Sequence, residues 1–221
     1  MNQSFSNKAL PLKRPNWNFS QDRDSNLLWL DKNECNYSKT RNLVKNIFHS
    51  ININSLSTYP DLTTAYNLFE KNFQVKQENA YFTYGSDAAI RIFFEFCSNN
   101  SRNLSTLLLR PSFGMYEVYA KYYSNNVIYI DYQSLHENFQ SDHEQIFFEI
   151  DKLKKGDIFI VANPESPLGI SYKEEEILKI ISKCNEKGVF ILLDETYIGF
   201  SHTQSQRNLI NVYANLFVAG L

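Results

Sequence analysis

The sequence predicts an α/β protein with a largely parallel sheet and helices on the faces of that sheet. Short apolar runs alternate with amphipathic helical segments along most of the chain, which is the pattern of βαβ units. The run Val-Phe-Ile-Leu-Leu at residues 189–193 has no polar break, as expected of a strand buried on both faces. A buried helix segment could give the same pattern, but the run is short and Gly188 precedes it. Asp194 follows directly, at the predicted carboxyl end of this strand.

The first part of the chain reads as an arm, a strand and two helices. Residues 1–25 are expected to be irregular, because Pro11 and Pro15 exclude a regular helix there. A short strand is expected at residues 27–30. The spacing of apolar residues predicts helices at residues 40–51 and 62–73.

A turn is expected between these two helices, at residues 57–61. Pro60 restricts the residue before it to extended backbone, so Tyr59 is predicted to be extended. From this segment alone, Tyr59 is most simply an aromatic side chain that covers the core.

Residues 80–84 are expected to form a short strand, followed by a helix at residues 88–97. Gly85, Ser86 and Asp87 lie between them, and glycine followed by two capping residues indicates a helix start. The N-terminus of a helix presents free N–H groups and can hold a phosphate. Plain capping of the helix is the simpler reading of these three residues alone.

The middle of the chain continues the alternation. Strands are predicted at residues 106–109, 126–130 and 157–162, and helices at residues 117–123, 143–154 and 172–187. Pro111 ends the first of these strands, so Phe113 lies at or beyond the strand end. Residues 131–139 form a polar connection. The turn at residues 163–169 contains two prolines and a glycine, with Asn163 at the end of a strand.

Composition excludes several classes of protein. With 22 basic and 24 acidic residues the net charge is −2, which argues against a nucleic acid or a membrane surface as the main partner. No segment is expected to cross a bilayer. The three cysteines are scattered and no secretory signal precedes them, so free thiols in a reducing compartment such as the cytoplasm are expected. The four histidines show no metal-ligand spacing.

Several predicted strand ends bring distinctive groups to one edge of the sheet. Asp194 offers a negative charge, which is costly to bury unless it meets a cation or hydrogen-bond donors. Asn163 and Tyr197 offer hydrogen bonds, Phe113 an aromatic face, and residues 85–87 backbone amides for an anion. A flat, phosphorylated heteroaromatic molecule with a cationic ring nitrogen answers all of these groups. Pyridoxal 5′-phosphate (PLP) is such a molecule.

The motifs, taken in order, resemble those of the class I/II aminotransferases of PLP fold type I, and most closely those of histidinol-phosphate aminotransferases. The matching segments are Asn33-Glu34, Tyr59-Pro60-Asp61, Gly85-Ser86-Asp87, residues 111–116 (Pro-Ser-Phe-Gly-Met-Tyr), residues 163–169 (Asn-Pro-Glu-Ser-Pro-Leu-Gly) and residues 194–197 (Asp-Glu-Thr-Tyr). The resemblance runs from about Trp29 to Leu221. It implies an arm at residues 1–28 and part of the large, PLP-binding domain at residues 29–221.

The resemblance also implies a role for each candidate residue. Asp194 would face the ring nitrogen, Phe113 would stack on the ring, and Asn163 and Tyr197 would hydrogen-bond the ring oxygen. Gly85, Ser86 and Asp87 would bind the phosphate. Tyr59 would reach the phosphate of the neighbouring subunit, which implies a homodimer. The implied reaction moves an amino group between an amino acid, or an amino-alcohol phosphate, and a 2-oxo acid.

The chain departs from the family pattern in places. Phe113 replaces a tyrosine, and Glu165, Ser166 and Leu168 change the Asn-Pro turn. No lysine stands at the position of the Schiff-base lysine, so we expect these residues alone to lack transaminase activity. Three alternatives stay open: a decarboxylase of the same fold, of the threonine-phosphate type; a non-catalytic truncated homologue; and a nucleotide-binding protein. The nucleotide-binding alternative is disfavoured because no GxGxxG or Walker-type loop follows a strand in this sequence.

Overall fold

The structure, a computed structural model, describes residues 27, 35, 37–100, 103–124, 126–132 and 143–220. They belong to two compact units, one ending at Leu68 and the other containing the described residues from Phe69 onward. The strand expected at residues 27–30, the Asn33-Glu34 element and most of the polar connection at residues 131–139 lie outside the described residues, apart from Leu27, Asp131 and Tyr132.

The unit that ends at Leu68 contains α1 (Ser38–Ser50), a short 3₁₀ helix (Ile53–Leu56) and the beginning of α2 (Thr63–Phe73). Both predicted helices are confirmed to within two residues at each end. Leu43, Val44, Ile47 and Phe48 follow helical spacing along α1, and all four are exposed. This unit therefore has an apolar helix face that no described residue buries.

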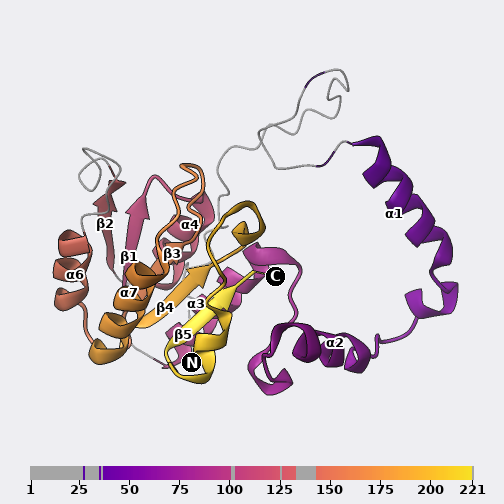
Figure 1. Cartoon of the computed structure of the whole chain (residues 1–221). Coiled ribbons are helices and arrows are strands. Elements are labelled where there is room, and N and C mark those ends of the chain that lie inside the picture. The colour runs from indigo at the N-terminus through magenta and orange to yellow at the C-terminus, as the bar shows by residue number, and fades with distance from the viewer. Residues whose placement is uncertain are drawn as a thin grey trace, which may run out of the picture. The chain divides into compact units, whose positions relative to one another are not determined.

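The second unit is an α/β sandwich, shown with its labels in Figure 1. Its elements in chain order are α3 (Gly85–Asn100), β1 (Ser105–Arg110), α4 (Gly114–Tyr123), β2 (Asn126–Asp131), α6 (His143–Lys152), β3 (Ile158–Ala162), α7 (Glu174–Lys187), β4 (Phe190–Asp194) and β5 (Leu216–Ala219). The strands form one sheet in the order β2-β1-β3-β4-β5, and every pairing is parallel. The predicted fold class is confirmed. The edge strand β5 was not predicted as a strand, and among the described residues it pairs only with β4.

Helices cover both faces of this sheet, so the unit has two apolar cores. Leu107 and Leu109 of β1 pack with residues of α6 and α7 on one face. Leu108, between them, packs with residues of α3 and α4 on the other face, because successive side chains of a strand point to opposite sides. All five residues of β3 are buried, as expected of a central parallel strand.

One predicted strand is wrong. Residues 80–84 form no part of the sheet, and α3 follows them directly, starting at Gly85. Ala80 has extended backbone, but Tyr84 is fully exposed and Tyr81 is largely exposed. Phe82 packs its ring edge-on against the ring of Phe69, at a centroid distance of 5.5 Å. The aromatic residues of this segment favour a strand, but no strand among the described residues pairs with it.

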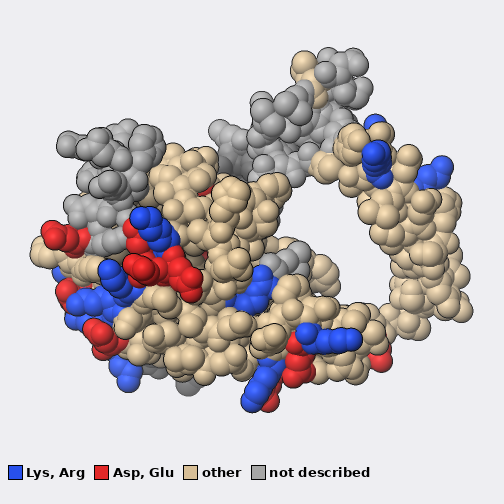
Figure 2. Space-filling model, viewed as in Figure 1, with Lys and Arg blue, Asp and Glu red and all other residues tan. Residues whose placement is uncertain are grey.

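The surface carries charges of both signs. Figure 2 shows Lys and Arg side chains interspersed with Asp and Glu over the α/β unit on the face that it displays. No helix among the described residues is both long enough and apolar enough to cross a lipid bilayer.

Candidate functional site

The order of the strands creates a switch point between β1 and β3. From β1 the chain moves outward to β2, whereas from β3 it moves the opposite way to β4. The connections that leave the carboxyl ends of β1 and β3 therefore diverge, and such a place is where open α/β sheets bind ligands. Phe113 follows β1 and Asn163 follows β3, so two of the predicted site residues flank this point.

Asp194 is the last residue of β4 and lies opposite Ala162 of β3. It is only 5% exposed, and donors surround its carboxylate. Tyr116 Oη donates to Oδ2 at 2.6 Å, and the backbone N and the Oγ1 of Thr196 donate to Oδ1 at 2.9 and 2.6 Å. A carboxylate with this many donors is stabilised in its charged form, so Asp194 is built to present a negative charge at the strand ends.

Tyr116 is a site residue whose role the sequence did not reveal. It lies one turn after Phe113, its ring packs edge-on against the Phe113 ring at 5.6 Å, and its hydroxyl holds Asp194. Burial, together with the negative charge of Asp194, raises the pKa of Tyr116 well above its usual value. The hydroxyl therefore keeps its proton and stays a donor. The spacing of three between Phe113 and Tyr116 at a helix start was the available signal.

Asn163 is buried and joins two elements. Its backbone N–H donates to the carbonyl of Asp194 at 2.8 Å, and its Oδ1 accepts from the backbone N–H of Tyr172 at 3.0 Å. The side-chain oxygen is thus used inside the protein, and only its Nδ2 group can meet a ring oxygen. Ser166 is the first residue of this turn with a partly exposed side chain. The role of Asn163 stays a prediction.

Gly85, Ser86 and Asp87 form the first turn of α3, which is 16 residues long. Gly85 has φ +79°, and no atom lies within 4 Å of the place that a Cβ would occupy. The backbone conformation, and not crowding, therefore explains glycine here. The first turn of a helix of this length has free N–H groups that can bind an anion.

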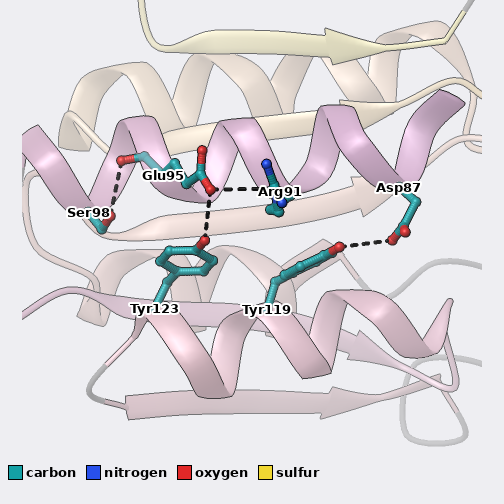
Figure 3. Close-up of polar contacts among 6 residues, drawn as sticks. All are labelled: Asp87, Arg91, Glu95, Ser98, Tyr119 and Tyr123. Carbon is teal, nitrogen blue, oxygen red and sulfur yellow. Dashed lines mark hydrogen bonds and ion pairs between the residues drawn. The ribbon is translucent and has the colours of Figure 1, made fainter. Parts of the chain in front are cut away.

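Tyrosine hydroxyls of α4 fix the position of α3, as Figure 3 shows. Tyr119 donates to Asp87 at 3.2 Å, and Tyr123 donates to Glu95 at 3.1 Å. Because both members of the second pair lie further along their helices, α3 and α4 run in the same direction. The start of α3 therefore lies at the same end of the unit as the start of α4, which follows the carboxyl end of β1.

The other two predicted residues, Tyr197 and Tyr59, lie in different units of the structure. Tyr197 is half-buried three residues after Asp194, where it precedes a 3₁₀ helix (Ile198–Phe200) and packs its ring at 6.4 Å from that of Phe200. Tyr59 belongs to the other unit, and its side chain is fully exposed. The structure thus gathers Asp194, Asn163 and Phe113, adds the start of α3 and Tyr197 at the same end, and leaves Tyr59 as a separate prediction.

Comparison with known proteins shows the family of the chain. Residues 25–220 match the family described as aminotransferase class I and II. The chain belongs to this family. A histidinol-phosphate aminotransferase from Flavobacterium johnsoniae is 31% identical over 170 residues, which is 75% of this chain and 45% of that relative. The chain spans about half the length of the curated relatives that it matches.

Solved structures agree with the fold. The histidinol-phosphate aminotransferase from Clostridium acetobutylicum matches with a TM-score of 0.62 at 26% identity, over 80% of this chain and 50% of that one. L-threonine-O-3-phosphate decarboxylase from Porphyromonas gingivalis matches with a TM-score of 0.61 at 21% identity, over 81% of this chain and 50% of that one. At that identity the second likeness shows the shared fold alone.

Class I and II aminotransferases are PLP-dependent enzymes, and the site fits the donor set that this cofactor needs. A buried carboxylate, which suits a cationic ring nitrogen, lies beside the switch point, and Phe113 lies close by through Tyr116. The start of a long helix lies at the same end and suits a phosphate. No group of His, Cys, Asp and Glu side chains in the part of the chain that the structure describes is arranged to hold a metal ion.

A hollow of about 590 Å³ lies against Phe113. It is lined from β1, β2 and the start of α4, and its lining residues do not include Asp194 or Asn163. Arg110 and Asp131 form an ion pair at 2.9 Å on its wall. Since the hollow misses the buried carboxylate, we place the candidate cofactor site by the side-chain chemistry and not by this hollow.

Removal of the Tyr116 hydroxyl should weaken the folded state. Tyr116→Phe keeps the ring but leaves Oδ2 of the buried Asp194 without its 2.6 Å donor. Hydrogen bonds to charged groups contribute about 1.5–3 kcal/mol, so we expect the free energy of unfolding to fall by about that amount in urea titrations. Tyr119→Phe is the matched control on the same helix. Its hydroxyl bonds the less buried Asp87 at 3.2 Å, and a loss as large as that of Tyr116→Phe would contradict the special role of Tyr116.

Proposed function

We propose that residues 29–221 form part of the large domain of a PLP-dependent aminotransferase. The reaction would move an amino group between an amino acid, or an amino-alcohol phosphate, and a 2-oxo acid. The observation that carries this proposal is Asp194, a buried carboxylate held by three donors at the end of β4. The name of the Flavobacterium johnsoniae relative supports the amino-alcohol phosphate as substrate.

Each candidate residue has a defined task under this proposal. When bound, PLP supplies a protonated pyridine ring that accepts electrons from the substrate. Asp194 keeps the proton on the ring nitrogen, and Phe113 orients the ring by stacking. Asn163 and Tyr197 donate hydrogen bonds to the ring oxygen. The first turn of α3, Gly85 to Asp87, holds the phosphate.

We propose that the working assembly is a homodimer. Tyr59 is fully exposed, and as a ligand group it makes sense across a subunit interface. The exposed apolar face of α1 supports the same assembly, because a contiguous apolar surface of this kind is typical of an interaction site. Sedimentation of the intact protein tests this, and a monomer at all concentrations would argue against the dimer.

The lysines present in residues 1–221 do not include a match to the lysine that binds PLP covalently. We therefore propose that these residues bind PLP through the groups named above but do not transaminate. Lys179 and Lys183 lie within α7, whereas Asp194 lies at the end of β4. The Nζ of Lys183 forms an ion pair with Asp151 at 2.7 Å.

The test is a titration of the purified 221-residue chain with PLP, followed by absorbance, and an assay of amino-acid-dependent turnover. Robust turnover by this chain would refute the second part of the proposal. Failure of a version extended to include a Ser-Lys segment to bind PLP would refute the first part. Release of carbon dioxide from the substrate by that extended version would instead identify a decarboxylase of the same fold.

A further inference from the structure

A second acid, Glu165, is buried beside the candidate site and takes no part in the proposed cofactor contacts. It lies in the turn between β3 and α7 and is 3% exposed. Its backbone closes the turn, since its N–H donates to the carbonyl of Ile170 and its carbonyl accepts from the N–H of Gly169, both at 2.7 Å. These backbone bonds close the turn at residues 163–169, which includes Asn163, and the side chain of Glu165 adds a hydrogen bond from Tyr132 Oη at 3.3 Å.

The carboxyl group of Glu165 accepts few hydrogen bonds. Its Oε2 accepts from Tyr132 Oη at 3.3 Å, and Tyr132 Oη also lies 3.0 Å from Tyr172 Oη. Its Oε1 is buried and has no hydrogen bond of good geometry among the described residues. No ion pair of the described residues involves Glu165. An ionised carboxylate in such a place would be left largely uncompensated.

Asp194 and Glu165 therefore differ sharply in their surroundings. Three donors hold the carboxylate of Asp194 at 2.6–2.9 Å, whereas the hydroxyl that reaches Glu165 does so at 3.3 Å. Two neighbouring carboxyls in a region of low dielectric disfavour double ionisation. The proton accordingly belongs on the acid with the weaker donors, and the charge on the acid with the stronger ones.

We propose that Glu165 is a positioning residue that acts as a neutral acid, fixing the turn at residues 163–169, while Asp194 carries the negative charge of this pair of carboxyls. The part of this inference that concerns the cofactor site rests on the proposed function. The protonation state does not, because it follows from burial and hydrogen bonding alone.

The electrostatics of the surroundings agree. Burial, to which the negative charge of Asp194 adds, raises the pKa of Glu165 to about 8. The Tyr132 hydroxyl and the backbone at Ser166 and Ala162 act in the opposite direction, but they lower the pKa by less than burial raises it.

The groups around Glu165 are mostly hydroxyls that keep their protons. The titratable groups that face it are Tyr132 after β2, Tyr172 before α7, Asp194 of β4 and Tyr116 of α4, with Glu176 of α7 acting on Tyr172. Burial raises the pKa of all three tyrosines, so their hydroxyls stay protonated near neutral pH.

The sign of the pH dependence follows from this. A glutamate in the unfolded chain releases its proton near pH 4.3, whereas folded Glu165 keeps its proton up to about pH 8. Between these values the folded state binds one proton more, so the stabilisation is complete at low pH and is lost as the pH rises. The folding equilibrium constant should fall about tenfold per pH unit through this window because of Glu165.

The experiment compares urea unfolding of the full 221-residue chain and its Glu165→Gln variant from pH 5 to pH 9. Glutamine is uncharged at every pH, so the ratio of the two folding constants should shift toward the variant by about tenfold per pH unit up to pH 8 and then level off. The contributions of other titrating groups, such as Glu195, another buried acid, cancel in this ratio. Glu186→Gln, on the exposed side of α7, is the surface control for the loss of one carboxylate. A flat ratio for Glu165→Gln would overturn the proposal.

Binding of PLP tests the positioning role separately. Glu165→Ala, which leaves the turn without its side-chain anchor, should weaken PLP binding by about tenfold or more, and Glu165→Gln should recover most of that loss. Equal weakening by both substitutions would show that the negative charge is needed and would overturn the proposal. If the wild-type chain and its extended version bind no PLP while the pH-dependent ratio is observed, then the proposed function fails and the neutral Glu165 stands.

Discussion

Asp194→Asn should weaken binding of PLP by on the order of 100-fold, because loss of one member of a buried, hydrogen-bonded charge pair costs about 2–5 kcal/mol. Asparagine has nearly the same shape as aspartate, its oxygen can still accept from Thr196, and Tyr116 Oη can accept from its Nδ2 group. The fold should therefore survive while the negative charge opposite the ring nitrogen is lost. Titration of the purified variant with PLP, followed by fluorescence, measures the change.

Asp131→Asn is the matched control for this substitution. Asp131 also ends a strand of the same sheet, but it is exposed and pairs with Arg110 at the surface. We expect its affinity for PLP to stay within about twofold of the wild type, since exposed ion pairs contribute little. Equal losses in both variants, or none in Asp194→Asn, would remove Asp194 from the cofactor site.

Gly220→Ala should strongly destabilise the folded chain, although it adds only one methyl group. Gly220 has φ +138°, and a Cβ there would lie 2.8 Å from both the carbonyl carbon and the oxygen of Glu195 and 3.1 Å from the N of Thr196. These are backbone atoms and cannot rotate away. The strained backbone alone costs about 1–3 kcal/mol, and the clash adds to it, so we expect the free energy of unfolding to fall by about 3 kcal/mol or more.

Gly199→Ala provides the control, because no atom lies within 4 Å of its Cβ position and its φ does not lie in the left-handed region. Its effect should remain below about 1 kcal/mol. Circular dichroism during urea unfolding compares both variants with the wild type. If Gly220→Ala were as stable as Gly199→Ala, the close approach of residue 220 to the Asp194–Thr196 segment would be wrong.

The sheet could be predicted from sequence because its strands are apolar on both faces. Residues 157–162 and 189–193 contain short apolar runs that are typical of a parallel strand covered on both faces, and both strands are confirmed within one residue. The wrong prediction at residues 80–84 has a physical reason. Aromatic residues favour strands locally, but a strand also needs a neighbouring strand to pair with, and the local sequence does not show whether there is one. The strand β5 was missed for a related reason, since its four residues are too short to show a period.

The site was predictable where a motif carries its own chemistry and not where it depends on a distant partner. Asp194 could be placed at a strand end from the apolar run alone. The bond from Tyr116 joins residues 78 positions apart in sequence, and the link between Tyr132 and Glu165 joins residues 33 positions apart. Such contacts form only when the sheet brings the segments after β1 and β2 close to the ends of β4 and β3, so no local pattern could have shown which acid holds the proton.

The position of β5 has a practical consequence for handling the protein. Its outer row of amides and carbonyls faces no other strand among the described residues, and such a row is a template on which a further strand can be laid. Light scattering during purification of residues 1–221 would detect association of molecules through this edge. A mild solubilising additive, or a fusion partner that covers the edge, should reduce such association.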